Sequence, residues 1–308
     1  MNPLIVGVSY VVLSAAGFGV MSIFAVYAYG AGATVSSLLF LRFLFAALIF
    51  FALMAWRKQP LRVGKRQLMG LFVLGGVLYT MQSLSFFSSV QYISTSLAAL
   101  VLYTFPVFVA ILSYFVDKEA LGFKTVVAML LSLAGMGLVL GLSFDGVDPV
   151  GVLLAFGAAL FYSVYIIVGN RIGKGLSAYA TSAYVSLFAA LSLFGVSQAQ
   201  GGLSLTFDAQ GWWALAGIVV FSTVLAIGLF FRGLQLIGST KASVVSTAEP
   251  VVTILCSAAV FGETLGWMQL LGGCAVLAGA VLIVSGKDKE PVKQKPAEQQ
   301  PAAHSTMP

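Results

Sequence analysis

The chain has 308 residues, of which 60% are hydrophobic and only 8% are charged. A soluble domain carries roughly 25% charged residues, so this composition excludes the water-soluble class and predicts a protein embedded in a bilayer. The formal charge of +6 comes from short basic clusters between apolar runs, a distribution typical of membrane orientation signals and not of nucleic-acid binding.

Residues that bind metals or act as catalytic bases are scarce. The only histidine is His304, near the end of the chain, and the cysteines Cys256 and Cys274 lie in separate apolar runs. Metal sites and disulfides need such residues at defined spacings, and no such spacing occurs. We therefore expect no metal, no cofactor and no catalytic residue, so the chain is not predicted to be an enzyme.

Ten apolar runs follow one another, each long enough for the helix of about 20 residues that spans a bilayer. They cover approximately residues 4–29, 34–56, 67–90, 95–116, 121–142, 149–170, 177–197, 211–235, 241–261 and 266–285. Hydrophobicity within them is continuous and not alternating, which favours helices over the strands of a barrel. The first run lacks a basic leader, so we expect a retained helix and not a signal peptide. The predicted fold class is an all-α membrane protein of ten transmembrane helices.

The distribution of Lys and Arg predicts that both termini face the cytoplasm. Of the 16 basic residues, 15 fall on the inner side, in loops, at the inner ends of spans or in the tail, and Arg42 lies deep within a span. The predicted outer loops carry Asp145, Asp148, Asp208 and Glu263 instead. Residues 287–308 are rich in Pro, Gln, Ala and Lys, so we expect a disordered cytoplasmic tail.

The chain contains an internal repeat. Residues 86–138 align without a gap to residues 230–282, at an offset of 144 (250 − 106), and the matches include the rare pairs Gln91/Gln235 and Pro106/Pro250. The predicted repeats are residues 1–143 and 144–286, each with five spans. Because five is odd, the second copy enters the membrane from the opposite side, and such inverted repeats place a binding site between the copies near the midplane.

Ten spans, a five-plus-five repeat and the pattern Pro-x12-Glu in each copy resemble the EamA-type branch of the drug/metabolite transporter superfamily. The pattern is carried by Pro106 with Glu119 and by Pro250 with Glu263, and residues 41–47 (LRFLFAA) resemble the family's second span. The resemblance covers residues 4–285. It implies a carrier of the bacterial inner membrane, often an exporter of amino acids or other small metabolites.

We therefore expect a multi-pass secondary transporter that moves an amino acid or related compound, with export as the expected direction, by alternating access. The sequence has no phosphate-binding glycine loop, so the energy is expected to come from an ion gradient, with protons or another coupling ion, or from the substrate's own gradient. Monomer and homodimer are both open. The alternatives are a non-transporting membrane scaffold and a membrane enzyme.

Glu249 is a carboxylate inside an apolar run. An ionised side chain at that depth costs at least a few kcal/mol and usually faces a cavity or a partner. It is predicted either to contact substrate or to carry a coupling proton, and the alternative is a structural bond between helices. Ser246 and Thr253 follow the same helical face at i−3 and i+4, which favours a polar cavity wall.

Arg42 is the second candidate. It lies deep in the second span, at a depth from which its side chain can approach Glu249 or a substrate in the core. The alternative is that the guanidinium snorkels towards the outer headgroups.

Further candidates lie at helical spacing on spans one, three and six, and Tyr103 on span four is expected either in the interior or at the membrane interface. The alternative for all of them is ordinary packing. They are Phe18 and Ser22, Tyr79 and Gln82, Tyr103, and Tyr162 and Tyr165.

Pro106 and Pro250 each remove one backbone hydrogen bond in the middle of a predicted helix. We predict that they are hinges for a rocking motion, and the alternative is a static kink. Gly135, Gly272 and Gly279 make the fifth and tenth spans rich in small residues, which favours close helix packing within the bundle or between protomers.

Overall fold

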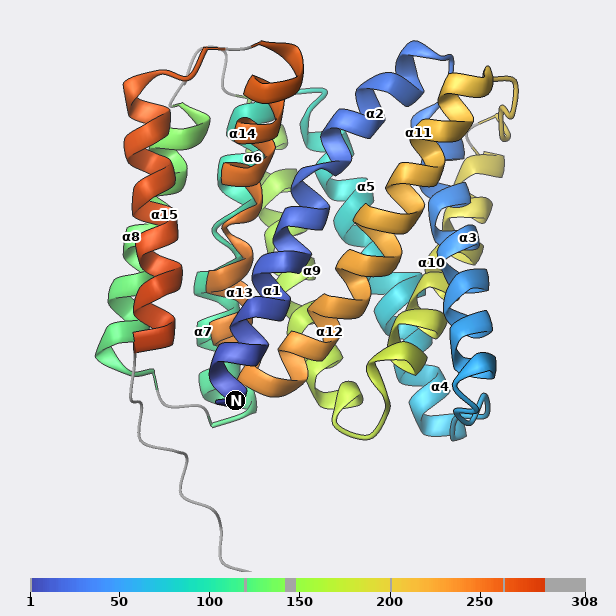
Figure 1. Ribbon diagram of the computed structural model, residues 1–308, viewed down its shortest axis with the longest axis horizontal. Coiled ribbons are helices and arrows are strands. Elements are labelled where there is room, and N and C mark those ends of the chain that lie inside the picture. The colour runs from blue at the N-terminus through green and yellow to red at the C-terminus, as the bar shows by residue number, and fades with distance from the viewer. Residues whose placement is uncertain (1, 119–120, 142–147, 200, 263, 286–308) are drawn as a thin grey trace, which may run out of the picture.

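Figure 1 shows the protein, a computed structural model, as a bundle of long helices that run between two ends. The structure describes residues 2–118, 121–141, 148–199, 201–262 and 264–285, and no strand occurs among them. The predicted tail and the motif residues Glu119 and Glu263 lie outside the described residues. The helices are α1 Pro3–Gly19, α2 Met21–Gly30, α3 Val35–Trp56, α4 Lys65–Phe72, η1 Val73–Tyr79, α5 Thr80–Ser89, α6 Thr95–Leu102, α7 Phe105–Val116, α8 Phe123–Leu140, α9 Pro149–Gly173, α10 Ala178–Ala199, α11 Ala209–Val219, η2 Val220–Leu225, α12 Ala226–Ile237, α13 Ser239–Ser246, α14 Glu249–Phe261 and α15 Trp267–Ser285.

The predicted all-α class is confirmed. Within the described part of the chain, nine helical segments are long and apolar enough to cross a membrane, and their bounds follow the predicted runs closely. The tenth predicted span is present as α15, which over Trp267–Ile283 counts as a shorter apolar helix. The count of ten crossings therefore stays a prediction.

Polar caps fix where several of these apolar helices begin. Asn2, Asp148 and Asp208 precede α1, α9 and α11, and each side chain accepts a hydrogen bond from a backbone N–H of the first turn (3.0, 2.7 and 3.0 Å). Such a cap contributes about 1 kcal/mol to a helix. The caps lie at the ends of the bundle, so they fix the residue at which each of these crossing helices begins.

The most extensive helix packings each join one helix of the first half to one of the second. They pair α8 with α15, α3 with α10, α1 with α12 and α5 with α9. In Figure 1 the α8–α15 pair forms one edge of the bundle and the α3–α10 pair the other. The α1–α12 pair joins spans one and eight, and the α5–α9 pair joins spans six and three. Because spans one and three of the first repeat correspond to spans six and eight of the second, these two pairs are equivalent. The two halves thus form one interlocked unit.

Glycine allows the closest of these approaches. A Cβ added at Gly135 of α8 would meet the backbone carbonyl of Gly272 in α15, and a Cβ at Gly272 would meet that of Gly135. The small-residue spans therefore pack on each other within the bundle.

Gly135→Ala is expected to destabilise the protein by about 1–3 kcal/mol, because the added methyl group has backbone and not a flexible side chain as its neighbour. Thermal unfolding in detergent measures the effect. The matched control is Gly195→Ala in α10, where an added Cβ meets nothing within 4 Å and where alanine favours the helix. Equal melting temperatures for the two variants would contradict the packing described for α8 and α15.

The basic loops gather at one end of the bundle. There Arg171 Nε donates to Asp117 Oδ1 at 2.9 Å, and Lys124 Nζ donates to the backbone carbonyl of Ser285 at 3.3 Å. α1 begins and α15 ends at this same end, which is the lower one in Figure 1. We call it the basic end.

Candidate functional site

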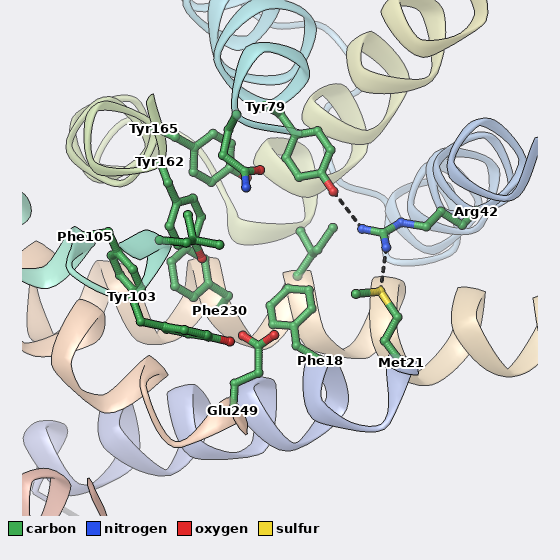
Figure 2. Close-up of a pocket in the computed structure, with 13 residues that line it drawn as sticks. Phe18, Met21, Arg42, Tyr79, Tyr103, Phe105, Tyr162, Tyr165, Phe230 and Glu249 are labelled. Carbon is green, nitrogen blue, oxygen red and sulfur yellow. Dashed lines mark hydrogen bonds between the residues drawn. The ribbon is translucent and has the colours of Figure 1, made fainter. Parts of the chain in front are cut away.

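A cavity lies at the centre of the bundle, with about 140 Å³ of water-accessible space. Both halves of the chain line it (Figure 2). The lining residues are Phe18, Met21, Arg42, Tyr79, Gln82, Leu102, Tyr103 and Phe105 from the first half and Tyr162, Tyr165, Ile227, Phe230 and Glu249 from the second.

The central cavity continues into a second one of about 310 Å³, which shares Arg42 and Glu249 with it. The second cavity is also lined by Tyr29 at the end of α2, Leu38 at the start of α3 and Phe87 near the end of α5. These helix ends lie at the end of the bundle opposite the basic end (Figure 1). The combined cavity therefore extends from the centre towards that opposite end.

Aromatic rings close the cavity on the side of the basic end. Tyr162 stacks on Tyr165 with ring centroids 5.9 Å apart, and Phe105 meets Tyr162 edge-on at 4.7 Å. Tyr165 in turn contacts Phe231, at 6.1 Å, and Phe231 has no exposed surface. We call Phe105, Tyr162, Tyr165 and Phe231 the aromatic layer.

Glu249 owes its position to a break in the ninth span. α13 ends at Ser246 and α14 begins at Glu249, and the Thr247 hydroxyl donates to the carbonyl of Val244 at 2.6 Å. The side chain of Glu249 is half-buried, and its carboxylate faces the cavity with the Tyr103 hydroxyl pointing towards it (Figure 2). The break thus presents a carboxylate at the first residue of a helix, directly on the cavity.

The prolines do not stand in mid-helix as predicted. Pro106 and Pro250 lie in the first turn of α7 and of α14, directly after a break between two helices. The missing backbone N–H costs nothing there, because the first N–H groups of a helix have no partner within it. Thr104 mirrors Thr247, since its hydroxyl donates to the carbonyl of Val101 at 2.7 Å.

Arg42 is buried, with 4% of its surface exposed. Its two terminal nitrogens donate to the hydroxyl of Tyr79 (2.9 Å) and to the sulfur of Met21 (2.6 Å), both drawn in Figure 2. Its Nε has no hydrogen-bond partner, and within the described part of the chain no carboxylate lies at ion-pair distance from it. The guanidinium therefore points into the cavity as an uncompensated charge and does not snorkel to the headgroups.

Two π-helical segments, η1 and η2, interrupt the third and eighth spans and were not predicted. η1 ends at Tyr79, and in η2 the Thr223 hydroxyl donates to the carbonyl of Ile218 at 2.9 Å. π-Helical turns occur frequently at functional sites, since they re-aim side chains. A Cβ at Gly75 of η1 would meet the backbone of Val185 in α10, so the segment lies against the second half of the bundle.

The structure brings ten of the predicted site residues to the combined cavity. They are Phe18, Ser22, Arg42, Tyr79, Gln82, Tyr103, Tyr162, Tyr165, Glu249 and Thr253. The hydroxyls of Ser22 and Thr253 both donate to the carbonyl of Gly19, at 3.2 and 3.1 Å. These two hydroxyls therefore link α2 and α14 to the end of α1.

Ser246 does not line the cavity. It is buried, and its hydroxyl donates to the carbonyl of Ala242 within its own helix at 2.8 Å. The prediction assumed one continuous helix through Glu249, and the break at residues 247–248 interrupts that face.

Sequence reasoning missed five residues that line the central cavity, Met21, Leu102, Phe105, Ile227 and Phe230. A signal existed for Phe105, because it is the repeat equivalent of Glu249 at the offset of 144 (249 − 105). The others are apolar residues, and nothing in the sequence distinguishes them from apolar residues that face the lipid. Within the described residues, no group of three or more His, Cys, Asp or Glu side chains comes together to hold a metal.

Comparison with known proteins agrees with this architecture. A model of the EamA-like transporter family matches the chain twice, over residues 5–141 and 149–285. The chain is 30% identical to the threonine/homoserine exporter RhtA of Escherichia coli (strain K12) over 241 residues, which are 76% of this chain and 77% of that protein. It is 28% identical over 284 residues to an uncharacterized transporter of Archaeoglobus fulgidus, covering 90% and 95% of the two chains.

A protein of known crystal structure matches the fold with a TM-score of 0.78, over 92% of this chain and 98% of its own, at 19% identity. That likeness concerns the fold alone. The family model, in contrast, matches each half of the sequence separately. The chain is therefore a multi-pass membrane protein built from two repeats, and it belongs to the EamA-like transporter family of the drug/metabolite transporter superfamily.

Proposed function

We propose that the protein is a secondary transporter that exports a small metabolite, an amino acid or a related compound, across the bacterial inner membrane. The observation that carries this proposal is the central cavity, which both repeats line and which holds one cation, Arg42, and one carboxylate, Glu249. Charged side chains inside a membrane usually mark the path of a substrate or an ion. The relatives named threonine/homoserine exporters support amino acids as the first substrates to test.

The proposed mechanism is alternating access by ten helices in two inverted repeats, residues 1–143 and 144–286. The cavity extends to one end of the bundle and the aromatic layer closes it at the other. Rocking of the repeats about the breaks before Pro106 and Pro250 would open the layer and close the opposite end. Protons are the proposed coupling ion, with Glu249 as their carrier on the cavity; monomer and homodimer both fit this scheme.

Counterflow in proteoliposomes tests the transport function. Vesicles loaded with one unlabelled amino acid are diluted into the same amino acid in labelled form, and a transporter then accelerates accumulation of the label. Threonine and homoserine come first, followed by the other amino acids and by organic acids and amines. Failure of every solute to exchange faster than in protein-free vesicles would favour the scaffold alternative.

Pro250→Ala is expected to reduce counterflow about tenfold or more while the protein stays folded. Alanine returns the N–H, so α13 and α14 can join into one helix that turns Glu249 away from the cavity, and small misplacements of a binding group have effects of this size. The matched control is Pro149→Ala, in the first turn of α9, where the side chain of Asp148 caps the start of the helix. A wild-type rate in Pro250→Ala would exclude the hinge role.

The basic end is proposed to face the cytoplasm, because loops rich in Lys and Arg are retained there. In a background with both cysteines replaced by alanine, Lys174→Cys at the basic end and Leu205→Cys at the opposite end report the orientation. Both positions are exposed. A membrane-impermeant maleimide added to spheroplasts is expected to label Leu205→Cys at once and Lys174→Cys only after lysis. The reverse pattern would contradict the orientation.

A further inference from the structure

Arg42 is a cation that lacks an anion. A buried guanidinium is normally matched by a carboxylate or phosphate that accepts two of its N–H bonds in parallel. Here it has a phenol and a thioether as acceptors, and thioether sulfur is a weak one. The bonds to Tyr79 and Met21 use two of the five guanidinium N–H groups, and Nε is buried without a partner, so the fork retains donors for a ligand in the cavity.

Glu249 supplies the opposite charge on the same cavity. Its carboxylate is not paired with Arg42 at ion-pair distance, and both side chains line the same cavity. Figure 2 shows Phe18 between the two side chains in that view, with Arg42 to one side and Glu249 and Tyr103 to the other. The cavity thus has a cationic pole at Arg42 and, in the ionised form of Glu249, an anionic pole.

The remaining wall of the central cavity is mainly aromatic and aliphatic, and Gln82 adds an uncharged amide. Around the anionic pole, the Tyr103 hydroxyl points towards the carboxylate and the Phe18 ring lies beside it, so an ammonium group there would meet a negative charge, a hydroxyl acceptor and aromatic surface. Phe230, Ile227 and Leu102 add apolar surface without any further charge. A ligand that fits this wall carries two opposite charges and a short apolar or weakly polar remainder.

We propose that the cavity binds a zwitterion, with its carboxylate on Arg42 and its ammonium group on Glu249 beside Tyr103. This proposal rests on the proposed transport function and adds which residue binds each charge of the substrate. It also explains why Arg42 and Glu249 stay unpaired: each is completed by the substrate. A ligand with only one of the two charges would leave one buried charge of the protein uncompensated, which is costly.

The experiment measures binding of a zwitterion and of its two charge-deleted analogues to the purified full chain in detergent. For threonine, the analogue 1-amino-2-propanol lacks the carboxylate and 3-hydroxybutyrate lacks the ammonium group. Each analogue is expected to bind wild type at least tenfold more weakly than threonine. If another amino acid exchanges better in counterflow, that amino acid and its own two analogues take the place of threonine.

Two variants assign each charge of the ligand to its partner. In Arg42→Met, removal of the ligand's carboxylate should no longer weaken binding, while removal of its ammonium group still does. In Glu249→Gln the pattern is expected to be the converse. Such a cycle isolates the pairwise coupling from general damage to the site. Tyr79→Phe keeps the charge of Arg42 and removes one of its hydrogen bonds. It should weaken binding of threonine a few-fold and leave binding of 1-amino-2-propanol unchanged.

The control is Arg232→Met, an arginine that lies over the ring of Tyr10 (5.6 Å) outside the cavity, and it should bind all three ligands as wild type does. If loss of the ligand's carboxylate and loss of its ammonium group weakened binding equally in Arg42→Met and in Glu249→Gln, the proposal would be overturned. So would counterflow of solutes of a single charge with none of any zwitterion, although transport itself would then stand. Absence of counterflow for every solute would instead remove the proposed function on which the inference rests.

Discussion

Arg42→Met is expected to leave the protein folded, to stabilise it and to abolish transport. Arg42 is 4% exposed and its guanidinium has no counter-ion among the described residues, so the folded state carries the cost of a desolvated charge. Methionine has a similar length and no charge, and relief of that cost should raise the free energy of unfolding by about 1–3 kcal/mol. Counterflow should fall at least tenfold. Thermal unfolding in detergent and counterflow of the same preparation measure the two effects.

A gain in stability together with a loss of transport distinguishes a functional arginine from a structural one. A purely structural arginine, held by Tyr79 and Met21, would lower the melting temperature when removed, because its partners would lose their bonds. Arg232→Met at the basic end serves as the control, and it should change neither quantity by much, since exposed charges contribute little. A destabilised Arg42→Met that still transports would contradict the role given to Arg42.

Glu249→Gln is expected to reduce counterflow at least tenfold and to remove its pH dependence. The ionised carboxylate is the form that attracts a cationic group, so acidification neutralises it and the wild-type rate should fall as the pH is lowered. Glutamine has the same shape and does not titrate, so the variant should be slow and insensitive to pH. Counterflow at a series of equal internal and external pH values measures this.

The conservative variant Glu249→Asp sharpens the test. It keeps the titrating group and shortens the side chain, so part of the rate and the wild-type direction of the pH dependence should return. A Glu249→Gln protein with the wild-type rate and pH profile would take Glu249 out of the mechanism. Loss of activity in both variants together with a lowered melting temperature would point instead to a structural role.

The two charges also show how the repeats have diverged. Arg42 lies in the first repeat, and the second and seventh spans align at an offset of 143 (188 − 45), which makes Val185 its equivalent. Val185 is buried where its backbone approaches Gly75, so that position serves packing. Glu249 lies in the second repeat, and its equivalent Phe105 belongs to the aromatic layer. Each repeat thus contributes one charge, and neither repeat alone contains both.

The helices could be predicted from the sequence because bilayer spans require continuous apolar runs, and the described bounds follow those runs. Most of the central cavity could also be predicted, since polar side chains such as Arg42, Gln82 and Glu249 are rare in such runs and must face its interior. The repeat made the prediction stronger, because the matched prolines indicated equivalent places in both halves.

What could not be predicted depends on local departures from a regular helix. Ser246 shares the periodic face of Glu249 only if the ninth span is continuous, and the break at residues 247–248 moves it into packing. The π-helical segments change the register before Tyr79 without any residue that requires them. Met21 and Phe230 line the cavity because of how α2 and α12 cross their neighbours, and that crossing is a property of the assembled bundle.

The central claim is that a substrate crosses the membrane through the cavity between Arg42 and Glu249. Counterflow of amino acids in proteoliposomes, with wild type, Arg42→Met and Glu249→Gln reconstituted at equal amounts, tests it most directly. We expect wild type to exchange at least one amino acid well above protein-free vesicles, and both variants, although folded, to exchange it at close to the protein-free rate. Exchange by either variant at the wild-type rate would contradict the claim.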